Sequence, residues 1–196
     1  MVVSIYILIQ MPAYLFTFHS YRSWNADHPH GFVQVDRGVQ PPNVALARFY
    51  DQSAKQLPAL FDANQQRVIV WIAWDACNNR AWRLHAAAFE PTHAHILVSW
   101  QSTDTWQVVR GKLKNLVGWA LSMELGHDGR RWMVRGASRK RVCDRNHFDY
   151  LMKTYLPSHG DIFWKEGDNS PTPPNWALRN IVTSEPQASV GGYSQI

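Results

Sequence analysis

The sequence predicts an α+β domain in which helices pack on the faces of an antiparallel sheet. The first observation is the order of apolar patterns, which runs strand, helix, helix, strand, strand, helix, hairpin, helix. The second is a pair of strand patterns, Trp82–Phe89 and His95–Trp100, joined by the polar turn Glu90-Pro91-Thr92. The third is composition: 45% of the 196 residues are apolar and 18% are charged, which is enough apolar material for one core.

The first half of the chain contains one strand pattern and two helix patterns. Alternating apolar residues over Tyr14–Tyr21 predict a strand. Apolar side chains recur at helical spacing over Asn43–Leu60, directly after a Pro41-Pro42 pair that favours a helix start. A second helix is predicted over Ala63–Cys77.

The second half contains the clearest helix pattern, over Thr105–Leu125. The segment RRWMVRGASRKRVC follows, and we expect it to form a basic hairpin that turns at Gly136-Ala137. A last helix is expected to begin near Asp144 or Asn146 and to continue as far as Pro157.

These elements define residues 13–167 as the domain, with residues 1–12 as a leader and residues 168–196 as a C-terminal extension or tail. The leader is apolar, but it lacks a basic start and is interrupted at Gln10 and Pro12, so no membrane span is expected. The only cysteines, Cys77 and Cys143, form no CxxC pair. Their scarcity excludes a disulfide scaffold and favours a reducing, cytoplasmic location.

The charge of the chain favours a polyanionic partner. Twenty Lys and Arg residues against fifteen Asp and Glu residues give a net charge of +5. Seven basic residues fall within positions 130–145 and are interleaved with Trp132: Arg130, Arg131, Arg135, Arg139, Lys140, Arg141 and Arg145. This ribbon predicts contacts with DNA phosphates, with Trp132 as a stacking surface for an unpaired base. A solvated charged hairpin is the alternative.

His93 and His95 form the central motif. Residues i and i+2 of a strand point to the same face, so both imidazoles can approach one divalent cation. Ala94, between them, is expected to face the helices. The alternative is that two of the nine histidines fall two residues apart by chance.

Tyr155 and His159 form a second motif, four residues apart in YLPSH. If the helical turn persists past Pro157, the two side chains lie on one face about one turn apart. Tyrosine is among the side chains that act as covalent nucleophiles. The alternative is a core tyrosine followed by a helix-capping histidine.

In their order and spacing, these motifs resemble the single-tyrosine HUH transposases of small insertion sequences, including the REP-associated tyrosine transposases. That family has a histidine–hydrophobic–histidine motif on a strand, here His93-Ala94-His95 in FEPTHAHILVSW. A long helix, a basic turn and a helix with the nucleophilic tyrosine follow, with a polar metal ligand four residues after it, here Tyr155 and His159. The opening YLFTFHSYRSWNADHPHGFV also resembles the family's first strand and loop, and the resemblance covers Ala13 to Trp164.

The resemblance implies a ferredoxin-like or RRM-like sandwich fold. It also implies an enzyme that cleaves and rejoins single-stranded or hairpin DNA. Tyr155 would attack a phosphodiester, leaving a 5′-phosphotyrosine and a free 3′-hydroxyl. A Mg²⁺ or Mn²⁺ ion would be held by His93, His95 and His159. The family also implies a homodimer. The sequence does not display its interface, and the apolar Trp and Val positions of Leu97–Trp106 are candidates for it.

Two features depart from the family pattern. His159 stands where many members have Gln or Asn, and an all-histidine set favours a softer ion than Mg²⁺. Tyr150 is a rival nucleophile, but Thr154 rather than a metal ligand lies four residues after it. Three other functions fit parts of the pattern: a DNA-binding protein without catalysis, a replication-initiation or relaxase-type nuclease, and a metal-dependent hydrolase of small molecules.

Overall fold

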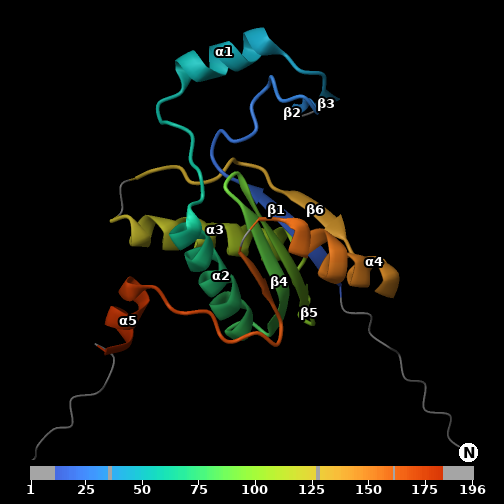
Figure 1. Ribbon diagram of the computed structural model, residues 1–196, viewed down its shortest axis with the longest axis vertical. Helices are drawn as coiled ribbons and strands as arrows, with labels where there is room; N and C mark the ends of the chain where they lie inside the picture. Colours follow the sequence, from blue (N-terminus) through green and yellow to red (C-terminus); the bar gives the residue numbers. More distant parts are fainter. Residues whose placement is uncertain (1–11, 35–36, 127–128, 161, 183–196) are drawn as a thin grey trace, which may run out of the picture.

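The computed structural model describes residues 12–34, 37–126, 129–160 and 162–182. It confirms an α+β architecture built on a five-stranded antiparallel sheet of order β6-β1-β5-β4-β7, with helices on its faces (Figure 1). The strands of this sheet are β1 (Ala13–His19), β4 (Trp82–Glu90), β5 (His93–Trp100), β6 (Ser138–Arg141) and β7 (Phe163–Lys165). A separate two-stranded sheet, which the sequence did not indicate, pairs β2 (Phe32–Gln34) with β3 (Gly38–Gln40). The helices are α1 (Val44–Ser53), α2 (Ala63–Asn78), α3 (Trp106–Glu124), α4 (Arg145–Tyr150) and α5 (Asn175–Val182).

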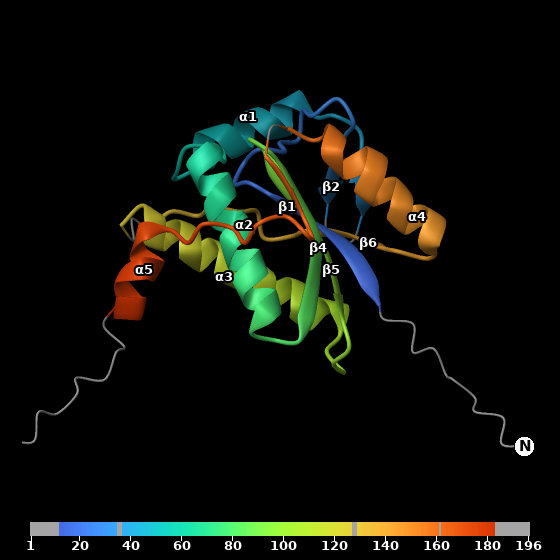
Figure 2. The ribbon, with the colours of Figure 1, turned by 60° about the horizontal axis from the view of Figure 1, so that its bottom comes forward.

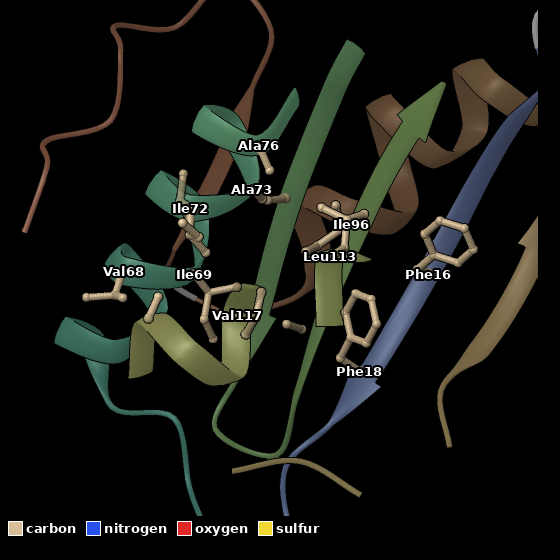
Figure 3. Close-up of a cluster of buried hydrophobic side chains, with 14 of the residues drawn as sticks. Phe16, Phe18, Val68, Ile69, Ile72, Ala73, Ala76, Ile96, Leu113 and Val117 are labelled. Carbon is tan, nitrogen blue, oxygen red and sulfur yellow. The ribbon is translucent and has the colours of Figure 1, made fainter. Parts of the chain in front are cut away.

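One face of the sheet packs against α2 and α3 and forms the larger core (Figure 3). Helix α2 begins at a capping box, in which Asp62 accepts from the main-chain N–H of Gln65 and the Gln65 side chain accepts from the N–H of Asp62. Its apolar side chains recur at helical spacing and meet those of α3 and of the central strands. The side chains that Figure 3 labels in this layer are Phe16, Phe18, Val68, Ile69, Ile72, Ala73, Ala76, Ile96, Leu113 and Val117.

The opposite face is covered by α4 and two further turns, a π-helix over Leu151–Tyr155 and a 3-10 turn over Leu156–Ser158. Figure 2 shows α4 on the other side of the sheet from α2 and α3. Leu15 of β1 and Leu97 of β5 are buried here against Leu151 and Leu156, in a second, smaller apolar cluster.

The alternation of β5 decides which residues reach which face. Ala94 is buried in the larger core, as predicted, and Leu97 in the smaller one. His93 and His95 therefore share the face of Leu97, under the turns that follow α4. Cross-strand pairing places His19 of β1 opposite His93 and Thr17 opposite His95.

The predicted helix over Asn43–Leu60 is shorter in the structure. Asn43 caps α1 by accepting from the N–H of Leu46, and the helix ends at Ser53. Pro58 disfavours helical backbone at the residue before it, so the pattern cannot continue to Leu60. The following segment instead returns to the core, where Ala59 donates its N–H to the carbonyl of Tyr21.

The basic hairpin predicted at Gly136-Ala137 is wrong. Both halves of this segment lie along the same edge of β1 rather than against each other: Met133 pairs with Ser20, and β6 pairs with Tyr14–Thr17. The free edge of β1 satisfies these backbone groups. The ammonium of Lys114 supports the intervening bend by donating to the carbonyls of three residues, Val134, Arg135 and Gly136.

Part of the predicted C-terminal extension is helical. Trp176 of α5 is buried, with its ring centroid 5.4 Å from that of Trp71 and 5.0 Å from that of Trp119. Residues 1–11 of the predicted leader and residues 183–196 lie outside the described residues. None of the helices in the described ranges is long and apolar enough to cross a membrane.

Two of the candidate interface positions in Leu97–Trp106 are not accessible to a partner, whereas Trp106 is half-buried. Val98 is fully buried in the protein's own core and Trp100 is 2% exposed. The larger exposed apolar side chains include Val33 and Val39 on the β2–β3 pair and Phe49 on α1.

Candidate active site

Three imidazoles meet at one end of the sheet. His93 and His95 come from the start of β5, and His159 comes from the residue that ends the 3-10 turn. One ring nitrogen of each lies within 4.8 Å of the other two. The structure therefore brings together the three histidines that the sequence and the family resemblance indicated.

The Nδ1 atom of each histidine has a partner within the protein. His159 Nδ1–H donates to the carbonyl of Tyr155 at 2.7 Å, and because a carbonyl only accepts, the lone pair of that ring lies on Nε2. Nδ1 of His95 lies 2.8 Å from the Thr17 hydroxyl, and Nδ1 of His93 lies 3.0 Å from the Thr92 hydroxyl. Such outer partners orient metal-binding imidazoles and leave Nε2 for the ion.

His95 is the most buried member of the cluster. His95 is only 3% exposed, and its Nε2 atom is buried with no hydrogen-bond partner within the described residues. Desolvation, reinforced by the neighbouring His93 and His159, lowers the pKa of His95 to about 3. A neutral imidazole with a buried nitrogen that lacks a hydrogen-bond partner is the form that binds a transition metal, so these residues fit a divalent cation.

Tyr155 lies directly beside this cluster. Its ring centroid is 4.4 Å from that of His159 and 5.4 Å from that of His95. The side chain is half-buried, and burial raises its pKa above the ordinary range of a tyrosine, with smaller contributions from Tyr150 and Glu90. A cation placed near the phenol would act against this shift, because positive charge favours the ionised form.

The π-helix explains the relative placement of the two tyrosines. Ideal α-helical periodicity would set residues five apart on different sides, whereas one wider turn at Leu151–Tyr155 brings the rings of Tyr150 and Tyr155 to 6.3 Å between centroids. Tyr150 is 51% exposed. Of the two, Tyr155 is the one whose ring contacts His95 and His159.

Gly160 fixes the loop that carries His159. Its φ is +60°, and a Cβ atom there would lie 1.9 Å from the carbonyl oxygen of Phe89. Only glycine allows the chain to pass so close to the end of β4. The His159 ring next to it lies 4.5 Å from the His95 ring between centroids.

The predicted DNA-binding residues are divided between the two faces of the sheet. Arg139 pairs with Phe16 and its guanidinium stacks on Trp106 at 3.6 Å, on the α3 side. Lys140 pairs with Leu15 and so lies on the face of the histidine cluster. Arg131, Arg135 and Arg141 are exposed, as are Arg139 and Lys140.

Trp132 does not provide the stacking surface that the sequence predicted. It is 4% exposed, because its segment lies against β1 and α3 rather than at the tip of a hairpin. It contributes instead to the wall of a hollow of about 420 Å³ on the α3 side, lined by Lys114, Asn115, Gly118, Arg130, Arg131, Trp132 and Met133.

Sequence reasoning missed several residues around the histidines. Thr17 and Thr92 hold His95 and His93, and His19 lies 5.5 Å from His93 between ring centroids. Burial, followed by the charges of His93 and His28, lowers the pKa of His19. The signal that would have found Thr17 and His19 is the antiparallel register of β1 and β5, which the sequence does not specify.

No family model and no curated protein matches this chain. Among solved structures, one similar fold is a REP-associated tyrosine transposase bound to a REP hairpin, with 7% sequence identity and a TM-score of 0.43. The match covers 72% of this chain and 62% of that one, so this chain spans less than two thirds of that structure. Similarity at this level assigns no family.

Proposed function

We propose that the protein cleaves and rejoins single-stranded DNA, including hairpin DNA, through a covalent bond to Tyr155, as a transposase or a protein derived from one. The observation that supports this most is the contact of the Tyr155 ring with two of three imidazoles whose nitrogens converge. A half-buried phenol beside three histidines that fit a metal supplies the two groups that nucleophilic attack on a phosphodiester requires, a nucleophile and a cation site.

His93, His95 and His159 would hold a divalent cation, Mg²⁺ or Mn²⁺, with the three histidines favouring the softer Mn²⁺. When bound, the cation would polarise the scissile phosphate and favour ionisation of the phenol. The protein's own contribution is orientation: Thr17, Thr92 and the Tyr155 carbonyl fix the three rings.

The proposed step is a transesterification. The Tyr155 oxygen attacks phosphorus and forms a new P–O bond, while the bond from phosphorus to the 3′-oxygen breaks. The phenol loses a proton and the departing 3′-oxygen gains one. One phosphodiester replaces another, so the reverse attack by a 3′-hydroxyl rejoins a strand without a nucleotide cofactor.

The exposed cations supply the proposed affinity for DNA. Arg131, Arg135 and Arg141 line the outer edge beside β1, and Lys140 lies on the same face as the histidines. Neutralising phosphates with such side chains makes affinity depend strongly on salt. A DNA strand bound along this edge would be able to contact both faces of the β-sheet.

A cleavage assay tests the proposal. Labelled hairpin oligonucleotides are incubated with the full chain and Mn²⁺, and with EDTA in place of Mn²⁺. We expect a shortened product with a 3′-hydroxyl only when the metal is present. Metal-dependent binding without cleavage of any hairpin would indicate a DNA-binding protein without catalysis instead.

We also propose that the protein acts as a homodimer, because strand transfer requires two DNA ends to be handled together. Light scattering of the protein at high micromolar concentration, with and without hairpin DNA, measures its mass. A monomer mass under both conditions would contradict the dimer without bearing on cleavage.

A further inference from the structure

We propose that Trp24, with His28 stacked on it, forms a platform beside the histidine cluster that binds an unpaired nucleobase of the DNA strand. The inference rests on the proposed function, because it takes the substrate to be single-stranded DNA. It adds a base-binding site next to the proposed reaction centre.

The platform belongs to a row of aromatic rings that leads into the histidine cluster. The His28 and Trp24 rings stack at 3.7 Å between centroids and 17° between planes. Trp24 in turn lies 5.3 Å from His19, and His19 lies 5.5 Å from His93. At the outer end, His30 is 5.6 Å from His28.

The indole is held in a fixed orientation by the loop around it. Trp24 Nε1–H donates to the carbonyl of Gly31 at 2.8 Å. Gly31 has a φ of +79°, and a Cβ atom there would lie 2.2 Å from the carbonyl oxygen of Gln40, so only glycine fits this turn. An aromatic ring that is already ordered loses little conformational entropy when a base stacks on it.

The loop is also tied to the turn that carries His93. Ser23 Oγ lies 2.9 Å from two carbonyl oxygens, those of Ser20 and Thr92, and the Thr92 hydroxyl reaches His93 Nδ1. Arg22, next to Ser23, has a φ of 62°, an uncommon conformation for a residue with a side chain. Its guanidinium is paired with Asp51 of α1 and donates to the carbonyl of Gln56. The position of Trp24 relative to His93 is therefore determined by several contacts.

Trp24 remains 41% exposed after these contacts. Trp119 of α3 is similarly exposed, at 45%, but its ring packs edge-on against Trp176 on the opposite side of the sheet. The ring neighbours of Trp24 are the imidazoles of His19 and His28 rather than core side chains. An exposed, immobilised indole beside a phosphate-cleaving centre suits stacking of a base, which tolerates any sequence.

The experiment compares two ligands that differ only in their bases. Affinity is measured for an oligothymidine of about 16 nucleotides and for an abasic oligonucleotide of the same length. We expect wild type to prefer the oligothymidine, Trp24→Leu to lose about tenfold of that preference, and Trp24→Phe to retain most of it. Trp119→Leu, the matched control, should keep the full preference.

Photocrosslinking to wild type supplies a measurement that does not depend on how a variant folds. With 5-iododeoxyuridine in the oligonucleotide, the crosslinked peptide should contain Trp24. Wild type that binds both ligands equally, a Trp24→Leu variant with unchanged preference, or crosslinks that all lie elsewhere would overturn the platform and leave the proposed cleavage standing. Wild type that binds neither ligand would overturn the proposed function as well.

Discussion

His159 Nδ1–H donates a 2.7 Å hydrogen bond to the main-chain carbonyl of Tyr155. The proposed third metal ligand and the proposed nucleophile are therefore linked through one turn of backbone. This bond fixes the proton of His159 on Nδ1, so that Nε2 is the nitrogen available to a cation. Any displacement of the Tyr155 turn should accordingly change metal affinity as well as reactivity.

We expect the His93→Ala/His95→Ala double variant to lose measurable Mn²⁺ binding, because it removes two of the three converging imidazoles. Calorimetric titration of Mn²⁺ into the variant and into wild type measures this. His147→Ala, which removes a half-buried histidine of α4, is the control and should bind as wild type does. Equal affinity in the double variant and wild type would eliminate the site.

Thr17→Val should weaken metal binding about 10- to 100-fold while keeping the fold. Thr17 is buried, at 8% exposure, and valine preserves the shape of its side chain. The substitution removes the hydroxyl that orients His95 through Nδ1. The same titration measures the affinity. Thr154→Val, at an exposed position near Tyr155, should have no effect. A Thr17→Val affinity equal to that of wild type would show that the hydroxyl does not support the site.

Gly160→Ala should displace His159, because the added Cβ would meet the Phe89 carbonyl at 1.9 Å. We expect weaker Mn²⁺ binding and a lower thermal unfolding midpoint, both measurable on the purified variant. Gly111→Ala is a suitable control, since a Cβ there has nothing within 4 Å. Wild-type affinity in Gly160→Ala would mean that the loop accommodates the methyl group without moving the ligand.

The edge cations should determine how DNA affinity depends on salt. Replacing Lys140 and Arg141 with Gln should lower the slope of log affinity against log salt by about 0.7 for each phosphate that the variant no longer neutralises. Arg139 is left in place, because its guanidinium also packs on Trp106. Replacing Arg67 of α2 and Lys165 of β7 with Gln, two exposed cations, makes the same change in charge. This control should keep the wild-type slope. Equal slopes of log affinity against log salt in the two double variants would show that the cations of β6 do not contact DNA phosphates specifically.

The metal-free protein should become less stable as the pH falls. The folded pKa of His95 is about 3, whereas a histidine in the unfolded chain titrates near 6.5. Between these pKa values the unfolded chain binds a proton that the folded chain excludes. The contribution of His95 to the free energy of unfolding is therefore complete above about pH 6.5 and is lost as the pH falls from there to about 3. Urea unfolding midpoints in EDTA, from about pH 8 to about pH 4.5, measure the trend. His95→Gln should show a shallower decline than wild type, and an identical decline would contradict the assignment.

Strand periodicity explains why part of the site could be predicted. Because β5 alternates between faces, the spacing of His93 and His95 was sufficient to place both imidazoles together and Ala94 in the core. The sheet class and the limits of α2 and α3 followed from apolar spacing in the same way. These features depend on local sequence, which is why they could be inferred without the fold.

Features set by distant contacts could not be predicted. The π-helix that brings the rings of Tyr150 and Tyr155 together lies where Leu151 and Leu156 are buried against the sheet, and no local motif indicated it. The basic segment resembled a hairpin, but the unpaired edge of β1 offered its backbone better partners. Thr17 became a partner of His95 only through the register of two strands that are far apart in sequence.

The formation of a covalent bond between Tyr155 and DNA tests the central claim most directly. A labelled single-stranded hairpin substrate is incubated with Mn²⁺ and wild type, Tyr155→Phe or Tyr150→Phe, and a denaturing gel is examined for protein-linked DNA. Each substitution removes one oxygen, so fold and DNA affinity should persist, and Tyr150→Phe is the matched control on the neighbouring ring. We predict linked product from wild type and Tyr150→Phe and none from Tyr155→Phe, whereas linked product that persists in Tyr155→Phe and disappears in Tyr150→Phe would contradict the account.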